Sequence, residues 1–93
     1  MRLSRALRMT RDTLYDAGRR DWDVRVSNAY RYCGKAEDWS QTITLSRMHT
    51  LLGTDADVTD TIRHEVAHAI VGTSHGHDSV WRATATALGA APG

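Results

Sequence analysis

The sequence TIRHEVAHAIV, residues 61–71, combines apolar side chains at helical spacing with two histidines four positions apart. On a helix this spacing places His64 and His68 on one face, with their Cβ atoms about 6 Å apart. Both rings can then reach one zinc ion at about 2.0–2.1 Å. Glu65 lies between them in sequence and can accept a proton from a metal-bound water, which peptide hydrolysis requires. The segment predicts a core-packed helix with a metal site. The alternative is a surface helix that holds these residues by coincidence.

The flanking residues predict where this helix ends and what completes the metal site. We expect Asp57 or Thr59 to cap its start and Gly72 to end it. The turn SHGHD, residues 74–78, then offers two further histidines. A catalytic zinc site uses three protein ligands and keeps one position for water, whereas a structural site has four. Two helix histidines and one turn histidine therefore predict a catalytic site for one Zn²⁺ ion.

Length and composition predict one small cytoplasmic domain over residues 1–93. Cys33 is the single cysteine, so neither a disulfide framework nor a cysteine-rich zinc ribbon can form within the chain. The first residues have an arginine at every third position and no continuous apolar stretch, so they do not form a signal peptide. No stretch approaches the roughly 18 apolar residues of a membrane span, so we expect no membrane partner.

Positive charge is concentrated near the beginning of the sequence. Residues 1–35 hold nine of the 12 Lys and Arg residues but only four of the 11 Asp and Glu residues. We expect a helix over residues 2–17, in which Arg2, Arg5, Arg8 and Arg11 recur every third position. These arginines form either a solvated face or a surface that contacts phosphates and associates with DNA.

The order of the remaining elements indicates an α+β domain. Residues 22–32 alternate as in a long half-buried strand, residues 33–38 form a turn, and residues 41–46 form a second strand. The two strands are expected to make a hairpin, with a third short strand left unplaced. Ser46 caps a short helix over residues 47–52, and a last helix runs from about Ser79 to Leu88.

Several short motifs together resemble the SprT-like family of zinc metalloproteases. The strand motif is Ile43-Thr44-Leu45-Ser46, the helix motif is His64-Glu65-x-x-His68-Ala69, and a Gly76-His77 turn precedes Trp81 and Arg82. The resemblance covers about residues 22–88. It implies that His64, His68 and His77 bind zinc and that Glu65 is the general base.

The sequence departs from the family pattern in two ways. Asp78 replaces a glycine that often follows the Gly-His pair, and its carboxylate is expected to cap the last helix or to orient a ligand histidine. Many family members continue into a zinc ribbon or DNA-binding segments. This sequence resembles a bare protease core without them, which puts a dependence on DNA in doubt.

A competing pattern, HExxHxxGxxH, would use a different third ligand. Its glycine and histidine positions fall on Val71 and Ser74, one residue before Gly72 and His75. We favour His77 as the third ligand because only it has the family spacing to Trp81. His75 is then either a contact to the oxyanion or substrate or an exposed turn residue. Trp81 is expected to pack behind the zinc site.

The sequence therefore predicts a zinc metalloendopeptidase that hydrolyses protein or peptide substrates. Its substrate would lie extended along an exposed edge of the hairpin, with loose sequence specificity. We expect Tyr30 and Tyr32 to belong to the core. The alternatives are a non-catalytic zinc-binding module and a nucleic-acid-associated interaction domain.

Overall fold

The structure of the protein, a computed structural model, describes residues 1–91 and has the predicted α+β architecture. The elements follow the order α1 (Leu3–Asp16), β1 (Asp23–Ser27), β2 (Gly34–Glu37), β3 (Thr42–Ser46), α2 (Arg47–Leu52), α3 (Asp55–Val71), the 3-10 turn η1 (Thr73–His75) and α4 (Ser79–Leu88). Within residues 1–91, every helix is too short or too polar to cross a bilayer.

The three strands form a mixed sheet in the order β1-β3-β2. β1 runs parallel to β3, with Val24 opposite Ile43, so the predicted hairpin between these two strands is wrong. The hairpin is formed instead by β2 and β3, in a stretch expected to be a turn. After β1 the chain crosses the end of β3, where Ser46 donates its hydroxyl to the Ala29 carbonyl at 2.7 Å. β2 then returns along the far side of β3, which leaves β1 and β3 pointing the same way.

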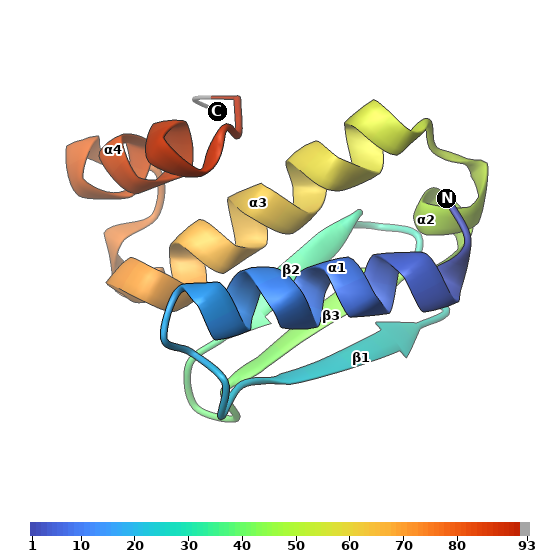
Figure 1. Ribbon diagram of the computed structural model, residues 1–93, viewed down its shortest axis with the longest axis horizontal. Coiled ribbons are helices and arrows are strands. Elements are labelled where there is room, and N and C mark those ends of the chain that lie inside the picture. Colours follow the sequence, from blue (N-terminus) through green and yellow to red (C-terminus); the bar gives the residue numbers. More distant parts are fainter. Residues whose placement is uncertain (92–93) are drawn as a thin grey trace.

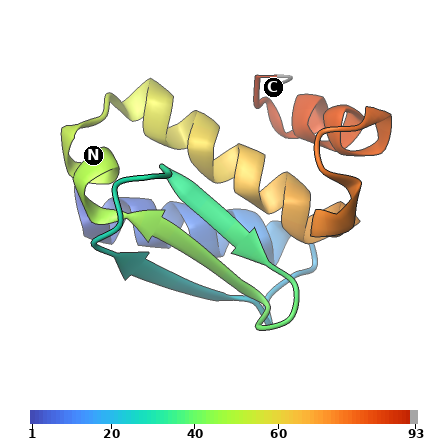
Figure 2. The same ribbon diagram turned by 180° about the vertical axis from the view of Figure 1, so that it is seen from behind.

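Helices α1 and α3 pack on one face of this sheet (Figures 1 and 2). Val24, Ile43 and Leu45 point from the strands into the core that these helices cover. From α3, Val58, Ile62, Val66 and Ala69 complete this core. α4 packs on α3 away from the sheet and buries a second apolar cluster around Trp81. α3 is thus held on two sides, which fixes the direction of its polar side chains.

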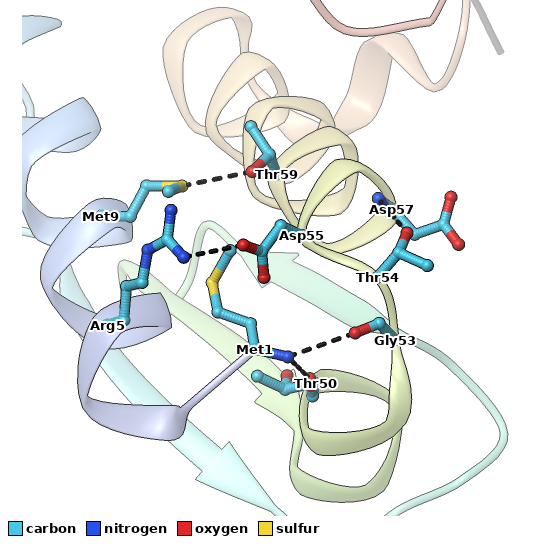
Figure 3. A network of polar contacts seen from close by, with 9 residues as sticks. All are labelled: Met1, Arg5, Met9, Thr50, Gly53, Thr54, Asp55, Asp57 and Thr59. Carbon is cyan, nitrogen blue, oxygen red and sulfur yellow. Dashed lines mark hydrogen bonds and ion pairs between the residues drawn. The ribbon is translucent and has the colours of Figure 1, made fainter.

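Contacts near the start of α1 hold it against the end of α2 and the first turns of α3 (Figure 3). Arg5 forms an ion pair with Asp55 at 2.8 Å, and Thr59 donates a hydrogen bond to the Met9 sulfur at 3.6 Å. The amino group of Met1 donates to the carbonyl oxygens of Thr50 (2.8 Å) and Gly53 (3.2 Å). Arg5, one of the four arginines that were candidates for contacting phosphates, therefore pairs with a carboxylate of the protein itself.

The helix boundaries follow the predicted signals except at the start of α3. Ser46 caps α2 as expected, by accepting a hydrogen bond from the His49 amide at 3.3 Å. α3 is capped by Thr54, whose hydroxyl accepts from the Asp57 amide at 3.1 Å, and not by Asp57 or Thr59. Gly72 ends α3 with φ 97°, a conformation that favours glycine.

Candidate metal centre

Three histidines converge at the C-terminal half of α3. His64 and His68 are one helical turn apart on α3, and His77 comes from the turn before α4. The Nε2 atom of His77 lies 3.0 Å from that of His64 and 3.2 Å from that of His68. Bonds of 2.0–2.1 Å at a tetrahedral angle would separate two ligand nitrogens by about 3.3 Å. The cluster therefore has the size and the donor atoms to hold one metal ion.

The turn that contains His77 is held by an aspartate in the connection between two strands. Asp38, in the turn between β2 and β3, accepts two hydrogen bonds from Thr73, one from its amide (2.8 Å) and one from its hydroxyl (2.9 Å). Gly76, with φ 56°, then reverses the chain so that His77 faces α3. Nothing in the sequence around Asp38 indicated this role, because the contact spans 35 positions.

Trp81 forms the back wall of the cluster. Its side chain is fully buried, and its ring centroid lies 4.4–5.1 Å from those of all three histidines. Its indole N–H donates to the His64 carbonyl at 3.4 Å. The indole therefore limits where the three imidazole rings can move.

Burial favours the neutral form of His64 and His68, the form that metal binding requires. Burial, followed by repulsion from His64 and His77, lowers the pKa of His68 to about 4, although Asp38 acts in the opposite direction. Burial and His77 also lower the pKa of His64, against an opposing effect of Asp60. The Nδ1 atom of His68 is buried and has no hydrogen-bond partner within residues 1–91. A metal-binding histidine usually donates its second N–H to an acceptor, so this ring departs from the common arrangement.

Glu65 lies beside the cluster and is buried. Only 8% of the residue is exposed, and burial raises the pKa of its carboxyl to about 8. Its Oε2 lies 3.9 Å from the His64 Nε2, and burial favours the neutral form of both groups by raising the pKa of Glu65 and lowering that of His64. A bound dication would favour the carboxylate. A carboxyl group with a pKa near neutrality is suited to taking and returning a proton.

Gly34 allows β2 to approach Glu65 closely. A Cβ atom at this position would lie 3.2 Å from the Glu65 Cγ and 3.1 Å from the Thr61 Cγ2. A glycine within a strand is a recognised sign of such an approach. The pattern of residues 33–38 predicts a turn, and the structure shows strand β2 there instead.

His75 and Asp78 form a separate pair outside the histidine cluster. The His75 Nδ1 lies 2.9 Å from one carboxylate oxygen of Asp78, and the other oxygen accepts a hydrogen bond from the Trp81 amide at 3.0 Å. Asp78 thus caps α4 and contacts His75, not His77. The hydrogen bond from Trp81, followed by that of His75, lowers the pKa of Asp78.

Tyr30 and Tyr32, both expected in the core, follow strand β1 and differ in how deeply they are buried. Tyr30 is 69% exposed, because the chain has left the sheet after Ser27 and runs over the surface. Tyr32 is half-buried, and its hydroxyl lies 2.9 Å from the Ser27 Oγ. The expectation of a core position is wrong for Tyr30.

Comparison with known proteins identifies one family. The family model described as SprT-like family matches residues 4–93, nearly the whole chain. Neither the curated proteins nor the solved structures contain a match.

Proposed function

The chain belongs to the SprT-like family, and from that membership and its three-histidine cluster we propose that it is a zinc-dependent metalloendopeptidase acting on protein substrates. The observation that supports this most strongly is the convergence of His64, His68 and His77 beside the buried Glu65. Three imidazole nitrogens are a donor set that suits zinc. When bound by three such ligands, zinc polarises a carbonyl group and lowers the pKa of a water molecule toward about 7.

In the proposed mechanism Glu65 moves the proton. Its carboxylate accepts a proton from the attacking water and returns it to the leaving amine. Burial of the carboxyl makes the protonated form accessible near neutral pH, which the second step requires. His75 is half-buried in the same turn as His77 and is a candidate contact to the developing oxyanion or to the substrate.

The edge of β2 is the proposed binding surface for the substrate backbone. Within residues 1–91, β2 pairs with β3 alone, which leaves its second edge without a strand partner. The beginning of this strand lies beside Glu65 and α3 (Figure 2). An extended peptide can pair with such an edge through main-chain hydrogen bonds, which select few side chains.

A protease assay on the zinc-loaded protein tests this proposal. Wild-type protein should cleave unfolded casein, and Glu65→Gln should retain zinc but lose cleavage by at least about 100-fold, the usual size of a general-base contribution. Asp12→Asn makes the same kind of acid-to-amide change at an exposed position of α1 and serves as the matched control. Full activity in Glu65→Gln, or none in zinc-loaded wild type, would contradict the proposal, and the second result would favour a non-catalytic zinc-binding module.

Association of the N-terminal arginines with DNA stays a prediction. Arg2, Arg8 and Arg11 are exposed on α1, while Arg5 is paired with Asp55. Binding through phosphates would weaken steeply with salt, and Arg8→Ala would reduce that dependence. Absence of binding at low salt would remove this prediction.

A further inference from the structure

An apolar cavity adjoins the metal centre on the side of α2. It has a volume of about 220 Å³, is partly open, and lies between α2, β3 and the first half of α3. Leu45 and Val58 contribute to its mainly apolar lining. Cys33 and Thr61 line both this cavity and the neighbouring hollow that contains His64 and Glu65. The cavity therefore adjoins the proposed catalytic site, with Cys33 and Thr61 between the two.

The wall of the cavity farthest from the metal centre is held in place by the contacts of Figure 3. Thr50 and Gly53 line it, and their carbonyl oxygens accept the hydrogen bonds from Met1. A Cβ atom at Gly53 would lie 2.6 Å from the His49 carbonyl oxygen and 3.0 Å from the Val58 Cγ2, so the wall is closely packed. A preformed cavity binds a ligand without the cost of ordering its wall.

The volume fits a large apolar side chain. An apolar protein cavity of about 150 Å³ is known to accept benzene. A space of about 220 Å³ can therefore accept the side chain of leucine, methionine or phenylalanine. Alanine would leave most of it unfilled.

We propose that this cavity binds a large apolar side chain of the peptide substrate, on the carboxyl side of the bond that is cut. This inference rests on the proposed protease function. β2 runs from Gly34, beside Glu65, toward Glu37. A peptide that pairs antiparallel with the free edge of β2 takes the more stable orientation and runs in the direction opposite to β2. It therefore passes Cys33 after the bond that is cut. Its residues on the carboxyl side then face the cavity.

Cleavage preferences test the proposal. We would map the sites cut in unfolded casein and then compare peptides that differ only at the residue after the cut bond: Leu, Phe, Ala or Arg. The leucine side chain has three more carbons than that of alanine. Each such carbon lost from a filled apolar pocket lowers kcat/KM by about 10-fold, so Leu should exceed Ala by about 1,000-fold. Arg is included because Asp57 also lines the cavity. No preference for Leu or Phe, a preference for Arg, or an apolar preference on the amino side would overturn the proposal.

Two substitutions at Val58 separate pocket shape from folding. Val58→Phe fills the cavity and should abolish the Leu-over-Ala ratio, whereas Val58→Ala enlarges it and should shift the preference from Leu toward Phe. Leu52→Phe adds the same ring on α2 at a position that is 80% exposed, and it should leave the ratio unchanged. The ratio is measured within each variant, so a partly unfolded sample does not change it. If Val58→Phe does not fold, Val58→Ala decides, and a preference equal to that of wild type contradicts the proposal.

A binding measurement on metal-free protein separates failure of this inference from failure of the protease function. N-acetyl-leucinamide should shift the amide NMR signals of Gly53, Val58 and Thr61 saturably, and N-acetyl-alaninamide should not. Loss of cleavage together with these shifts would refute the protease function and support the cavity as an apolar binding site. Cleavage without the preference and without the shifts would leave the protease function and refute the cavity.

Discussion

The indole of Trp81 lies 4.5 Å from the imidazole of His64, centroid to centroid, and its N–H points to the His64 carbonyl oxygen at 3.4 Å. This contact joins α4 to α3 at the position of a proposed metal ligand. Because Trp81 also contacts the rings of His68 and His77, one side chain supports all three histidines. The packing of the second apolar cluster and the geometry of the metal centre are therefore coupled.

Trp81→Ala should destabilise the protein and weaken metal binding together. Deleting a fully buried tryptophan costs about 3–5 kcal/mol through lost contacts and the cavity left behind. Urea unfolding with and without zinc measures both effects. Trp39→Ala is the matched control, since Trp39 is 85% exposed and its loss should change stability by less than about 0.5 kcal/mol. Equal effects of the two substitutions would show that Trp81 does not support the site.

Asp38→Ala should reduce metal affinity more than it reduces stability. The substitution removes both hydrogen bonds to Thr73, and these exposed bonds contribute about 1 kcal/mol to folding. Without them the turn that presents His77 is less restrained, so zinc should bind more weakly in a competition assay with a chromogenic chelator. Asp12→Ala, on the exposed side of α1, is the control. Unchanged zinc affinity in Asp38→Ala would refute the positioning role.

The stability of the metal-free protein should depend on pH through Glu65 and His68 in opposite directions. Burial raises the pKa of Glu65 from 4.5 to about 8, so the folded state keeps a proton that the unfolded chain releases, and stability is lost as the pH rises through that range. Burial, followed by repulsion from the other two histidines, lowers the pKa of His68 from 6.5 to about 4, so its contribution is lost as the pH falls through that range. In EDTA-treated samples Glu65→Gln should remove the decrease in Tm between pH 6.5 and 8. The same decrease in wild type and variant would contradict the assignment to Glu65.

Chelation should lower the melting temperature of the zinc-loaded protein. A metal that binds only the folded chain stabilises it by about 2.7 kcal/mol when the free ion is at about 100 times its Kd. Differential scanning calorimetry with and without EDTA measures the shift. His77→Ala should show no such shift, because it lacks one of the converging nitrogens. A zinc-loaded wild type that melts unchanged after chelation would contradict a site that exists only in the folded state.

The sequence predicted the elements whose signals are local. Ser46 caps α2 where expected, and the apolar spacing of Ile62, Val66 and Ala69 places α3 in the core as expected. The start of α3 was misplaced because Thr54, Asp57 and Thr59 all have suitable capping side chains. Of these, only Thr54 lies outside the helix with the required extended backbone. Such a choice depends on the backbone path and cannot be made from residue types alone.

The features that were missed depend on contacts between distant segments. β2 consists of Gly-Lys-Ala-Glu, which lacks the apolar alternation of a strand and becomes one only by pairing with β3. Alternation in β1 predicts which side chains face the core but does not determine whether the strand pairs parallel or antiparallel. The contact between Asp38 and Thr73 spans the two halves of the chain and has no local signal. The HExxH spacing on one helix, by contrast, was sufficient to place His64, His68 and Glu65 together.

Zinc content per chain, measured by elemental analysis on wild type, His64→Ala, His77→Ala and His75→Ala, tests the proposed metal centre most directly. We predict one zinc ion in the wild type and in His75→Ala, and its loss in His64→Ala and His77→Ala, because only His64 and His77 of these three histidines belong to the converging cluster. Zinc retained in His77→Ala but lost in His75→Ala would move the third ligand to His75. Absence of zinc from wild type, even after refolding with the metal, would contradict the metal centre and the enzyme function that depends on it.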